Sequence, residues 1–347
     1  QKVKNQVFAV RYRLEPKPQD LEKYKRGELV EPIKPIVYYV DPATPKKWVP
    51  YLIAGVNDWN AAFEKAGWKN AISGKEWPND STMSLEDARY SVIRYFASDI
   101  ENAYGPQVHD PRSGEILESH IGWYHNIMKL QHDWYMIQTA AVDPTARKMT
   151  LDDSLMSKLV RFVAAHEVGH TLGLRHNMGS SSKTPVEKLR DKEWLAKNGH
   201  TASIMDYARF NYVAQPEDGI AQNELFAHVG AYDKWAIQWG YTYTGLSDVE
   251  ADKKVNLFYS ALSGQILKVF PVPGDASNKW LSYLEISHPT GTALDSIKNI
   301  VPFYLNAVDR ATASGDYKLP NSLLKGLKAY QNKYGKAVML SDRKISS

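Results

Sequence analysis

The spacing of apolar side chains alternates between strand-like and helical periods along the 347 residues of the chain. Runs rich in β-branched and aromatic residues predict strands over residues 7–14, 36–40 and 92–96. Helical periodicity predicts helices over residues 48–66, 126–142, 154–172, 184–199 and 233–239. Two extended runs flank the turn-forming cluster 110–114, which predicts a hairpin between residues 105 and 125. This mixture of elements is typical of an α+β fold.

The same pattern divides the chain into three parts. Residues 1–34 hold the first strand and a charged connector, and residues 35–245 hold the remaining legible strands and helices. The pattern is weaker in residues 246–347, where it predicts helices over 294–313 and 319–334. We therefore expect one main α+β domain followed by a mainly helical C-terminal region.

The helix predicted over residues 154–172 has two contrasting faces. One face is apolar, repeats every fourth residue and should pack against the sheet: Val160, Ala164, Val168 and Leu172. The other face carries His166 and His170, which lie one turn apart and can therefore reach a single metal ion. Because catalytic zinc usually has three protein ligands and an open position, His176 is the candidate third ligand.

Two further residues make this helix a candidate catalytic site. A continuing helix would carry His176 away from the face of His170, whereas Gly173 can adopt the left-handed conformation that ends the helix and turns the chain back. Glu167 lies about 100° around the helix from His166, where its carboxylate can hydrogen-bond a zinc-bound water without ligating the metal. These five fixed residues recur by chance in roughly one chain of this size in 10⁵. The pattern predicts a zinc site with Glu167 as the general base.

Composition excludes several other kinds of site. The chain has no cysteine, which leaves histidine and carboxylate as metal ligands and excludes disulfides and cysteine nucleophiles. Its 43 basic and 39 acidic residues are spread along the sequence without a basic stripe, so we expect no nucleic acid partner. No run approaches the roughly 18 apolar residues that span a bilayer, so we expect a soluble chain without a membrane span.

A second recognisable segment, Ser203-Ile204-Met205-Asp206-Tyr207, follows the zinc motif. Together the two resemble the zinc motif, HExxHxxGxxH, and the Met-turn of the metzincin clan of zinc metallopeptidases. The resemblance implies one catalytic Zn²⁺ ion, held by His166, His170 and His176. It also implies a zinc-dependent endopeptidase, in which Glu167 activates the zinc-bound water that attacks a peptide bond.

The resemblance also gives roles to two residues of the second segment. Met205 would pack beneath the three histidines as a floor and would not ligate the metal. Tyr207 stands where astacins and serralysins carry a tyrosine that approaches the zinc, and its phenol would donate a hydrogen bond to the developing oxyanion. The alternative is that Tyr207 only lines the wall of the site. The chain has 21 tyrosines, so a tyrosine at this position is not by itself unusual.

Within this clan the chain resembles a bacterial family of large predicted zinc proteases called Met-zincins. The similarity lies in the stretches 35–59, 164–179 and 203–219 and covers residues 1–245 better than the remainder. Asn177 departs from the best-known metzincin groups, which usually have Asp, Glu, Ser or Pro after the third histidine. The resemblance implies an exported protein (periplasmic, cell-surface or extracellular), a protein or peptide substrate, and additional domains in a longer precursor.

The resemblance further implies how residues 35–245 fold. A metzincin-like catalytic domain has an upper part, here to about residue 176, and a lower part that contains the Met-turn. Its twisted mixed sheet packs on long helices, and residues 116–125 would form the antiparallel edge strand above the cleft, available to an extended substrate. Residues 208–216 would form the wall of the primed-side specificity pocket, with Phe210 and Tyr212 as candidates to line it.

Several alternatives stay open at the level of the sequence. A downstream glutamate, Glu187 or Glu193, would replace His176 as the third ligand in a gluzincin-like site, although both lie in a charged segment. The same ligands would serve a zinc hydrolase acting on non-peptide amides or esters. A non-catalytic surface or scaffold module would retain zinc for stability, although the intact Glu167 argues against it.

The remaining histidines in the first half of the chain match no tight ligand pattern: His109, His120, His125 and His132. We expect them to be solvated or hydrogen-bonded. A second, structural metal ion stays possible, because some metzincins bind one, but these spacings do not support it.

Overall fold

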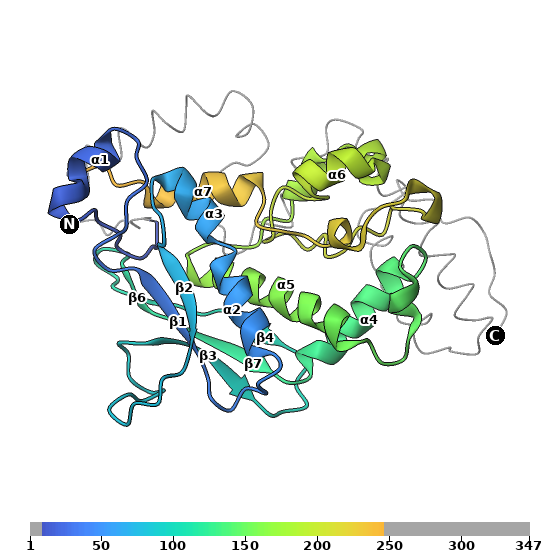
Figure 1. Cartoon of the computed structure of the whole chain (residues 1–347), viewed down its shortest axis with the longest axis horizontal. Coiled ribbons are helices and arrows are strands. Elements are labelled where there is room, and N and C mark those ends of the chain that lie inside the picture. Colours follow the sequence, from blue (N-terminus) through green and yellow to red (C-terminus); the bar gives the residue numbers. More distant parts are fainter. Residues whose placement is uncertain (1–8, 246–347) are drawn as a thin grey trace, which may run out of the picture. The chain divides into compact units, whose positions relative to one another are not determined.

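The computed structural model describes residues 9–245 (Figure 1). The predictions for residues 1–8 and for the helical C-terminal region 246–347 lie outside the described residues. A five-stranded sheet with the order β2-β1-β3-β7-β4 forms the centre of the described part. Its strands are β1 (Ile36–Val40), β2 (Ile72–Glu76), β3 (Ser91–Phe96), β4 (Ala103–Tyr104) and β7 (His120–Tyr124). Four strands run parallel and β4 joins β7 antiparallel, which confirms the predicted α+β, metzincin-like class.

The strand predictions were right where a run is apolar and wrong where pairing alone makes the strand. Strands β1 and β3 coincide with the predicted runs, with β3 one residue longer. Strand β2 was missed because its sequence, ISGKE, contains one apolar residue; it forms by pairing in parallel with β1, with Ile72 opposite Ile36. No strand covers residues 9–14, where Arg11 makes only an isolated bridge to Glu115.

The prediction of an antiparallel edge strand over residues 116–125 is wrong, because the segment divides between two sheets. Its first part, β6 (Ile116–Glu118), forms the predicted hairpin with β5 (Val108–His109) in a separate two-stranded sheet. Its second part, β7, lies inside the main sheet and runs parallel to β3. The antiparallel edge strand is β4, whose Tyr104 ring occupies the space beside Gly122 of β7. Because that ring covers the glycine, β7 is buried on both faces.

Seven α-helices occur within the described residues. They are α1 (Leu21–Lys25), α2 (Val49–Asn57), α3 (Asn60–Phe63), α4 (Ile127–Thr139), α5 (Asp153–Thr171), α6 (Lys192–Asn198) and α7 (Ala231–Tyr241). Short 3₁₀ turns occupy Pro18–Asp20, Glu64–Ala66, Pro144–Arg147, Ser180–Lys183, Val186–Arg190, Pro216–Asp218 and Gln222–Leu225. The helix predicted over 184–199 is therefore a 3₁₀ turn and α6, because the Asp191 side chain accepts a hydrogen bond from Trp194 N and starts a new helix there (3.0 Å).

Helix α5 carries the predicted metal ligands, and its position is set by α2. The apolar face predicted for it is buried, with Val168 fully inaccessible to solvent. This face packs mainly against α2, which also contacts β1 and β2 (Figure 1). Helix α5 itself contacts β4 and β7, and the hydroxyl of Tyr38 in β1 donates a hydrogen bond to Thr171 Oγ1 at its last residue (2.7 Å). Trp59, just after α2, donates an indole hydrogen bond to Ala165 O (2.8 Å) and fixes the two segments together.

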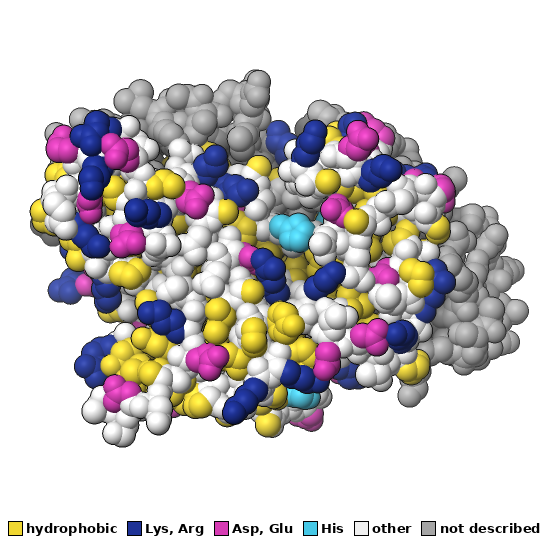
Figure 2. Space-filling view, in the orientation of Figure 1, with side chains coloured by type: hydrophobic (Ala, Val, Ile, Leu, Met, Phe, Trp, Pro, Cys, Tyr) yellow, Lys and Arg dark blue, Asp and Glu magenta, His cyan; other side chains and the backbone are white. Residues whose placement is uncertain are grey.

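The surface of the described part has a mixed charge. Lys and Arg side chains lie beside Asp and Glu side chains over the face shown in Figure 2, with no extended area of one sign. Between residues 9 and 245, no helix is both long and apolar enough to cross a lipid bilayer.

Candidate metal centre

Three histidine side chains converge where α5 ends. The Nε2 atom of His176 lies 3.2 Å from Nε2 of His166 and 3.0 Å from Nε2 of His170. Among residues 9–245 these three form the one group of histidines and carboxylates close enough to hold a metal ion. The glutamates considered as alternative ligands, Glu187 and Glu193, are exposed and do not belong to this group.

Gly173 produces the chain reversal that returns His176 to the helix. Its φ of 93° lies in the left-handed region, as predicted. The amide of Gly173 donates to His170 O (3.0 Å) and that of Leu174 to Gly169 O (3.1 Å), the two hydrogen bonds of a Schellman motif. A side chain at position 173 would also collide with the carbonyl oxygen of Val10, so glycine is required there for two reasons.

The hydrogen bonds of the other ring nitrogens fix the direction of the metal-binding lone pairs. The Nδ1 atom of His166 donates to Ile204 O (2.8 Å), and that of His170 donates to Leu174 O (3.0 Å). A neutral imidazole has one N–H, and in His166 and His170 that N–H is on Nδ1. Their Nε2 atoms therefore both present lone pairs to Nε2 of His176, which can donate a hydrogen bond to only one of them. A cation between the three nitrogens removes this conflict.

The distances also suit zinc. Tetrahedral zinc with Zn–N bonds of about 2.0–2.1 Å separates its nitrogen ligands by about 3.3 Å, close to the separations of 3.0 and 3.2 Å found here. Burial lowers the pKa of His166 to about 3 and that of His176 to about 4, with a smaller contribution from neighbouring positive charge. The imidazoles are therefore neutral at pH 7, which is the form that binds a metal.

Glu167 shares a cavity with the three histidines. The cavity has a volume of about 330 Å³ and is lined by residues 103–107, the three histidines, Glu167 and Tyr207. Glu167 is 7% exposed, and burial raises the pKa of its carboxyl to about 7. A bound cation would lower that pKa again. The carboxyl therefore stands beside the ligands in a position to exchange a proton with a bound water or substrate.

Met205 is buried against helix α5. Its side chain is fully inaccessible to solvent, and its sulfur occupies the space where a side chain at Gly169 would stand. Its carbonyl oxygen accepts a hydrogen bond from the amide of Asn177, the residue after the third histidine (2.8 Å). Met205 thus contacts both the helix that carries His170 and the turn that carries His176.

Tyr207 lies at the mouth of the cavity, and 45% of its surface is exposed. Its ring centroid is 4.3 Å from that of His176 and 6.0 Å from that of His166. Phe210, a candidate for lining the primed-side pocket, is instead fully buried against Tyr135 in the core. The sequence does not show which way a residue of this irregular segment faces.

The part of the chain that holds this site resembles a known protein family. Residues 148–263 match the family model described as Met-zincin. The resemblance predicted from the two motifs is thereby confirmed, and the Met-zincin segment includes α5, Met205 and Tyr207, although not the stretch 35–59. No curated protein and no solved structure matches the chain. A three-histidine site in a Met-zincin segment supports a zinc metallopeptidase-like activity in general.

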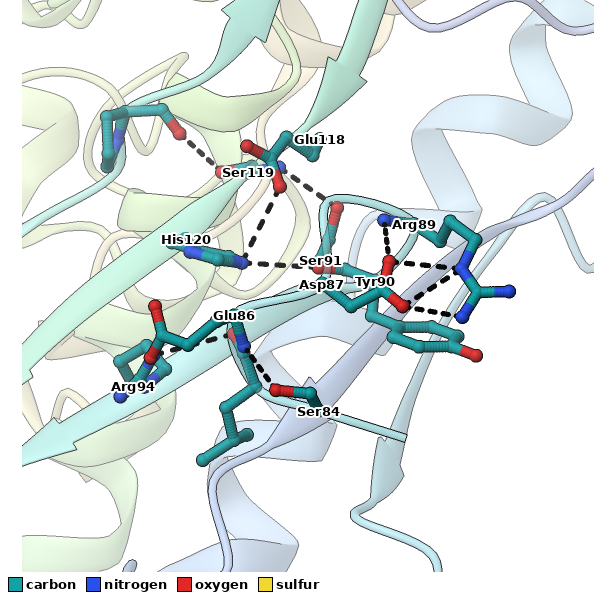
Figure 3. A network of polar contacts seen from close by, with 12 residues as sticks. Ser84, Glu86, Asp87, Arg89, Tyr90, Ser91, Arg94, Glu118, Ser119 and His120 are labelled. Atoms are coloured by element: carbon teal, nitrogen blue, oxygen red, sulfur yellow. Dashed lines mark hydrogen bonds and ion pairs between the residues drawn. The ribbon is translucent and has the colours of Figure 1, made fainter. Parts of the chain in front are cut away.

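The histidines that precede the Met-zincin segment lie in other environments. Figure 3 shows His120 beside Glu118, with Nε2 3.3 Å from Tyr90 O and 3.7 Å from Oε2 of Glu118. Each of the other three has a polar partner: His109 with Gln107, His125 with Tyr95, and His132 with Asp133 and Lys148. Within residues 9–245 these histidines take part in no metal-binding group.

The sequence analysis missed one residue at this site, Arg209. Its guanidinium carbon lies 4.5 Å from the ring centroid of Tyr207 and 3.2 Å from that of Trp134 in α4. No motif marks it, since arginine is common in surface loops. Its backbone is also in the left-handed region (φ 53°), which is uncommon for a residue with a side chain and marks a constrained position.

Proposed function

We propose that this protein is a zinc-dependent endopeptidase. The proposal rests on one observation: three imidazole Nε2 atoms converge within zinc-ligand distances beside the buried carboxyl of Glu167, in a single open cavity. A stabilising zinc site in a scaffold does not require an acid in this position. The Met-zincin match supports the same class of chemistry.

The residues of the cavity suit the hydrolysis of an amide. When bound, zinc supplies Lewis acidity that polarises the substrate carbonyl and acidifies a water molecule. Glu167 takes a proton from the attacking water and passes it to the nitrogen of the leaving amine. The hydroxyl of Tyr207 donates a hydrogen bond to the carbonyl oxygen as negative charge develops there.

The edge of the sheet provides a place for an extended substrate. Strand β4 pairs with β7 on one side, no strand of the described residues pairs with its other side, and residues 103–107 line the cavity. The backbone groups of an edge strand can pair with a peptide of almost any sequence. A peptide bound in this way would pass over the histidines and Glu167, which favours a peptide over a small amide or ester as the substrate.

The decisive test is proteolysis of a denatured protein by the zinc-loaded chain, with Glu167→Gln as the inactive variant. We expect a chelator to abolish cleavage, added zinc to restore it, and the variant to bind zinc at full stoichiometry while losing at least about 10³-fold in kcat. Cleavage by zinc-loaded Glu167→Gln would overturn the mechanism. Hydrolysis of esters without proteolysis would indicate a non-peptide hydrolase, and a chelator that lowers only the melting temperature would indicate a scaffold.

We further propose that the protein acts outside the cytoplasm on protein or peptide substrates, as the protease portion of a longer exported chain. The family resemblance supports this, and the mixed surface charge gives no reason to expect a nucleic acid partner. Fractionation of cells that make the full-length protein tests the location, and recovery in the cytoplasm alone would contradict it.

A further inference from the structure

Arg209 is held in a fixed position at the edge of the metal centre. Its guanidinium carbon lies over the indole of Trp134, 3.2 Å from the ring centroid, and next to the ring of Tyr207, which itself contacts the ring of His176. Aromatic faces hold a guanidinium in one orientation while leaving the N–H groups on its edge free to donate. A side chain restrained in this way is prepared for binding.

The charge of Arg209 has no partner in the described part of the chain. Within residues 9–245 no carboxylate forms an ion pair with Arg209, and no acceptor takes a hydrogen bond from its guanidinium. The guanidinium nitrogen atoms are not buried. Arg190 provides the contrast, because it pairs with both Glu217 and Asp218 at 2.8 Å. Partial burial lowers the pKa of Arg209 only to about 10, so the group stays cationic at neutral pH. A partly desolvated cation without a partner favours the arrival of an anion.

The position of Arg209 relative to the ligands sets where that anion would lie. Its guanidinium carbon lies 4.5 Å from the ring centroid of Tyr207, which lines the cavity and contacts the ring of His176, so one side chain separates the cation from the three histidines. Among residues 9–245, Glu167 is the only acidic residue that lines the cavity. A guanidinium with its donors in one plane binds a carboxylate through two parallel hydrogen bonds.

We propose that Arg209 binds a carboxylate of the substrate next to the scissile bond, and that the protein therefore prefers substrates that are acidic at that position. The carboxylate belongs either to an Asp or Glu side chain or to the C-terminus of a short product-side peptide. This inference rests on the proposed peptidase function and names the substrate class of the same site.

Matched peptides test the preference in the wild-type, zinc-loaded protein. One set compares Asp with Asn, and Glu with Gln, at each position flanking the cleaved bond; a second set compares a free C-terminus with an amide. We expect kcat/KM to be about 10- to 100-fold higher for the carboxylate member of one pair. The first set identifies a side-chain carboxylate, and the second a terminal one. Equal rates within both sets would overturn the proposal.

Variants then separate recognition of a carboxylate from simple support of Tyr207. Arg209→Gln should lower kcat/KM for the carboxylate peptide more than for its neutral partner and so remove the preference, and Arg209→Lys should restore part of it. Arg112→Gln, which removes an equal charge from the exposed hairpin turn, should leave the preference unchanged. A loss of equal size on acidic and neutral peptides would mean that Arg209 only supports the site, and would overturn the proposal.

Binding measurements keep this inference distinct from the proposed function. Calorimetry with zinc-loaded Glu167→Gln should give about a tenfold lower Kd for the acidic peptide than for its neutral partner, without any hydrolysis. Tighter binding without cleavage by the wild type would refute the peptidase function and support the role of Arg209. Cleavage of the acidic and neutral peptides at equal rates would support the peptidase function and refute the role of Arg209.

Discussion

The Nδ1 atom of His166 donates a hydrogen bond to the carbonyl oxygen of Ile204, 2.8 Å away and 38 residues later in the sequence. The amide of Ile204 in turn donates to Oδ2 of Asp233 (2.8 Å), whose other oxygen accepts from Ser203 Oγ (2.6 Å). Asp233 stands in the first turn of α7 and is fully buried. His166, the first of the proposed metal ligands, is therefore oriented through the backbone of Ile204 by a carboxylate from a third segment of the chain.

Replacement of Asp233 tests this connection. We expect Asp233→Asn to lower the free energy of unfolding by about 1–3 kcal/mol and the zinc affinity by about tenfold, because an amide leaves one buried donor unsatisfied. Chemical denaturation and zinc competition with a chromophoric chelator measure the two effects. The exposed Asp153→Asn serves as the control. Unchanged zinc affinity in a stable Asp233→Asn protein would exclude an orienting role.

Gly173→Ala tests the chain reversal that returns His176 to the site. The left-handed backbone and the collision with the carbonyl oxygen of Val10 should together cost more than the ~1 kcal/mol of the backbone conformation alone. Gly219→Ala is the matched control, because Gly219 is also left-handed (φ 62°) but has open space where a Cβ would stand. We expect zinc affinity to fall only in Gly173→Ala. Equal effects of the two substitutions would show that the contact with Val10 is unimportant.

The buried carboxyl of Glu167 predicts an unusual pH dependence in the metal-free protein. Its pKa is raised from 4.5 to about 7, so the folded state binds more protons than the unfolded state between these values, and the stabilising contribution is lost as the pH rises through this window. Relative to the wild type, Glu167→Gln should therefore gain stability, of the order of 1–3 kcal/mol, between pH 4.5 and pH 8. Urea denaturation in the presence of a chelator measures this, with Glu187→Gln as the exposed control.

His166 and His176 make the folded state less stable as the pH falls, which is opposite to the effect of Glu167. Their pKa values fall from 6.5 to about 3 for His166 and about 4 for His176, so the unfolded state takes up protons first and the folded state loses stability as the pH falls below about 6.5. Protonation also competes with the metal, so zinc should dissociate on acidification. A metal-free protein as stable at pH 4.5 as at pH 6.5 after Glu167→Gln would contradict this account.

Met205→Ala tests the floor beneath the site. Removing a fully buried methionine should lower the free energy of unfolding by about 2–5 kcal/mol. Zinc should still bind at full stoichiometry, with a weaker affinity, because the methionine packs against the ligand helix at Gly169 and supplies no ligand. Zinc titration of the refolded variant measures the stoichiometry and the affinity, and urea denaturation measures the free energy of unfolding. Complete loss of zinc from a folded Met205→Ala protein would give the residue a larger role than packing.

Tyr207→Phe tests the hydroxyl alone, since the ring contacts with His176 and Arg209 remain. If the hydroxyl stabilises the transition state, kcat should fall by about 10²-fold, with KM and zinc affinity nearly unchanged. A tyrosine that only lines the wall would lose little in kcat. Steady-state kinetics on one neutral peptide distinguishes the two roles.

The sequence by itself determined the elements and residues that depend on near neighbours. Helix α5 and its two faces follow from a 3.6-residue period, and the left-handed turn follows from a glycine placed three residues after His170. Strand β1 follows from an uninterrupted apolar run. These features are local, because hydrogen bonds and side-chain packing within a few residues decide them.

Only the tertiary structure decided the features that join distant segments. Strand β2 has almost no apolar pattern and exists because β1 pairs with it. The antiparallel edge strand is β4, not residues 116–125, because β4 pairs with β7 at the end of the sheet. The direction of the His166 lone pair depends on Ile204, and the place of Arg209 depends on Trp134 of α4. Such contacts depend on how whole elements pack together, which the spacing of residues along one segment does not contain.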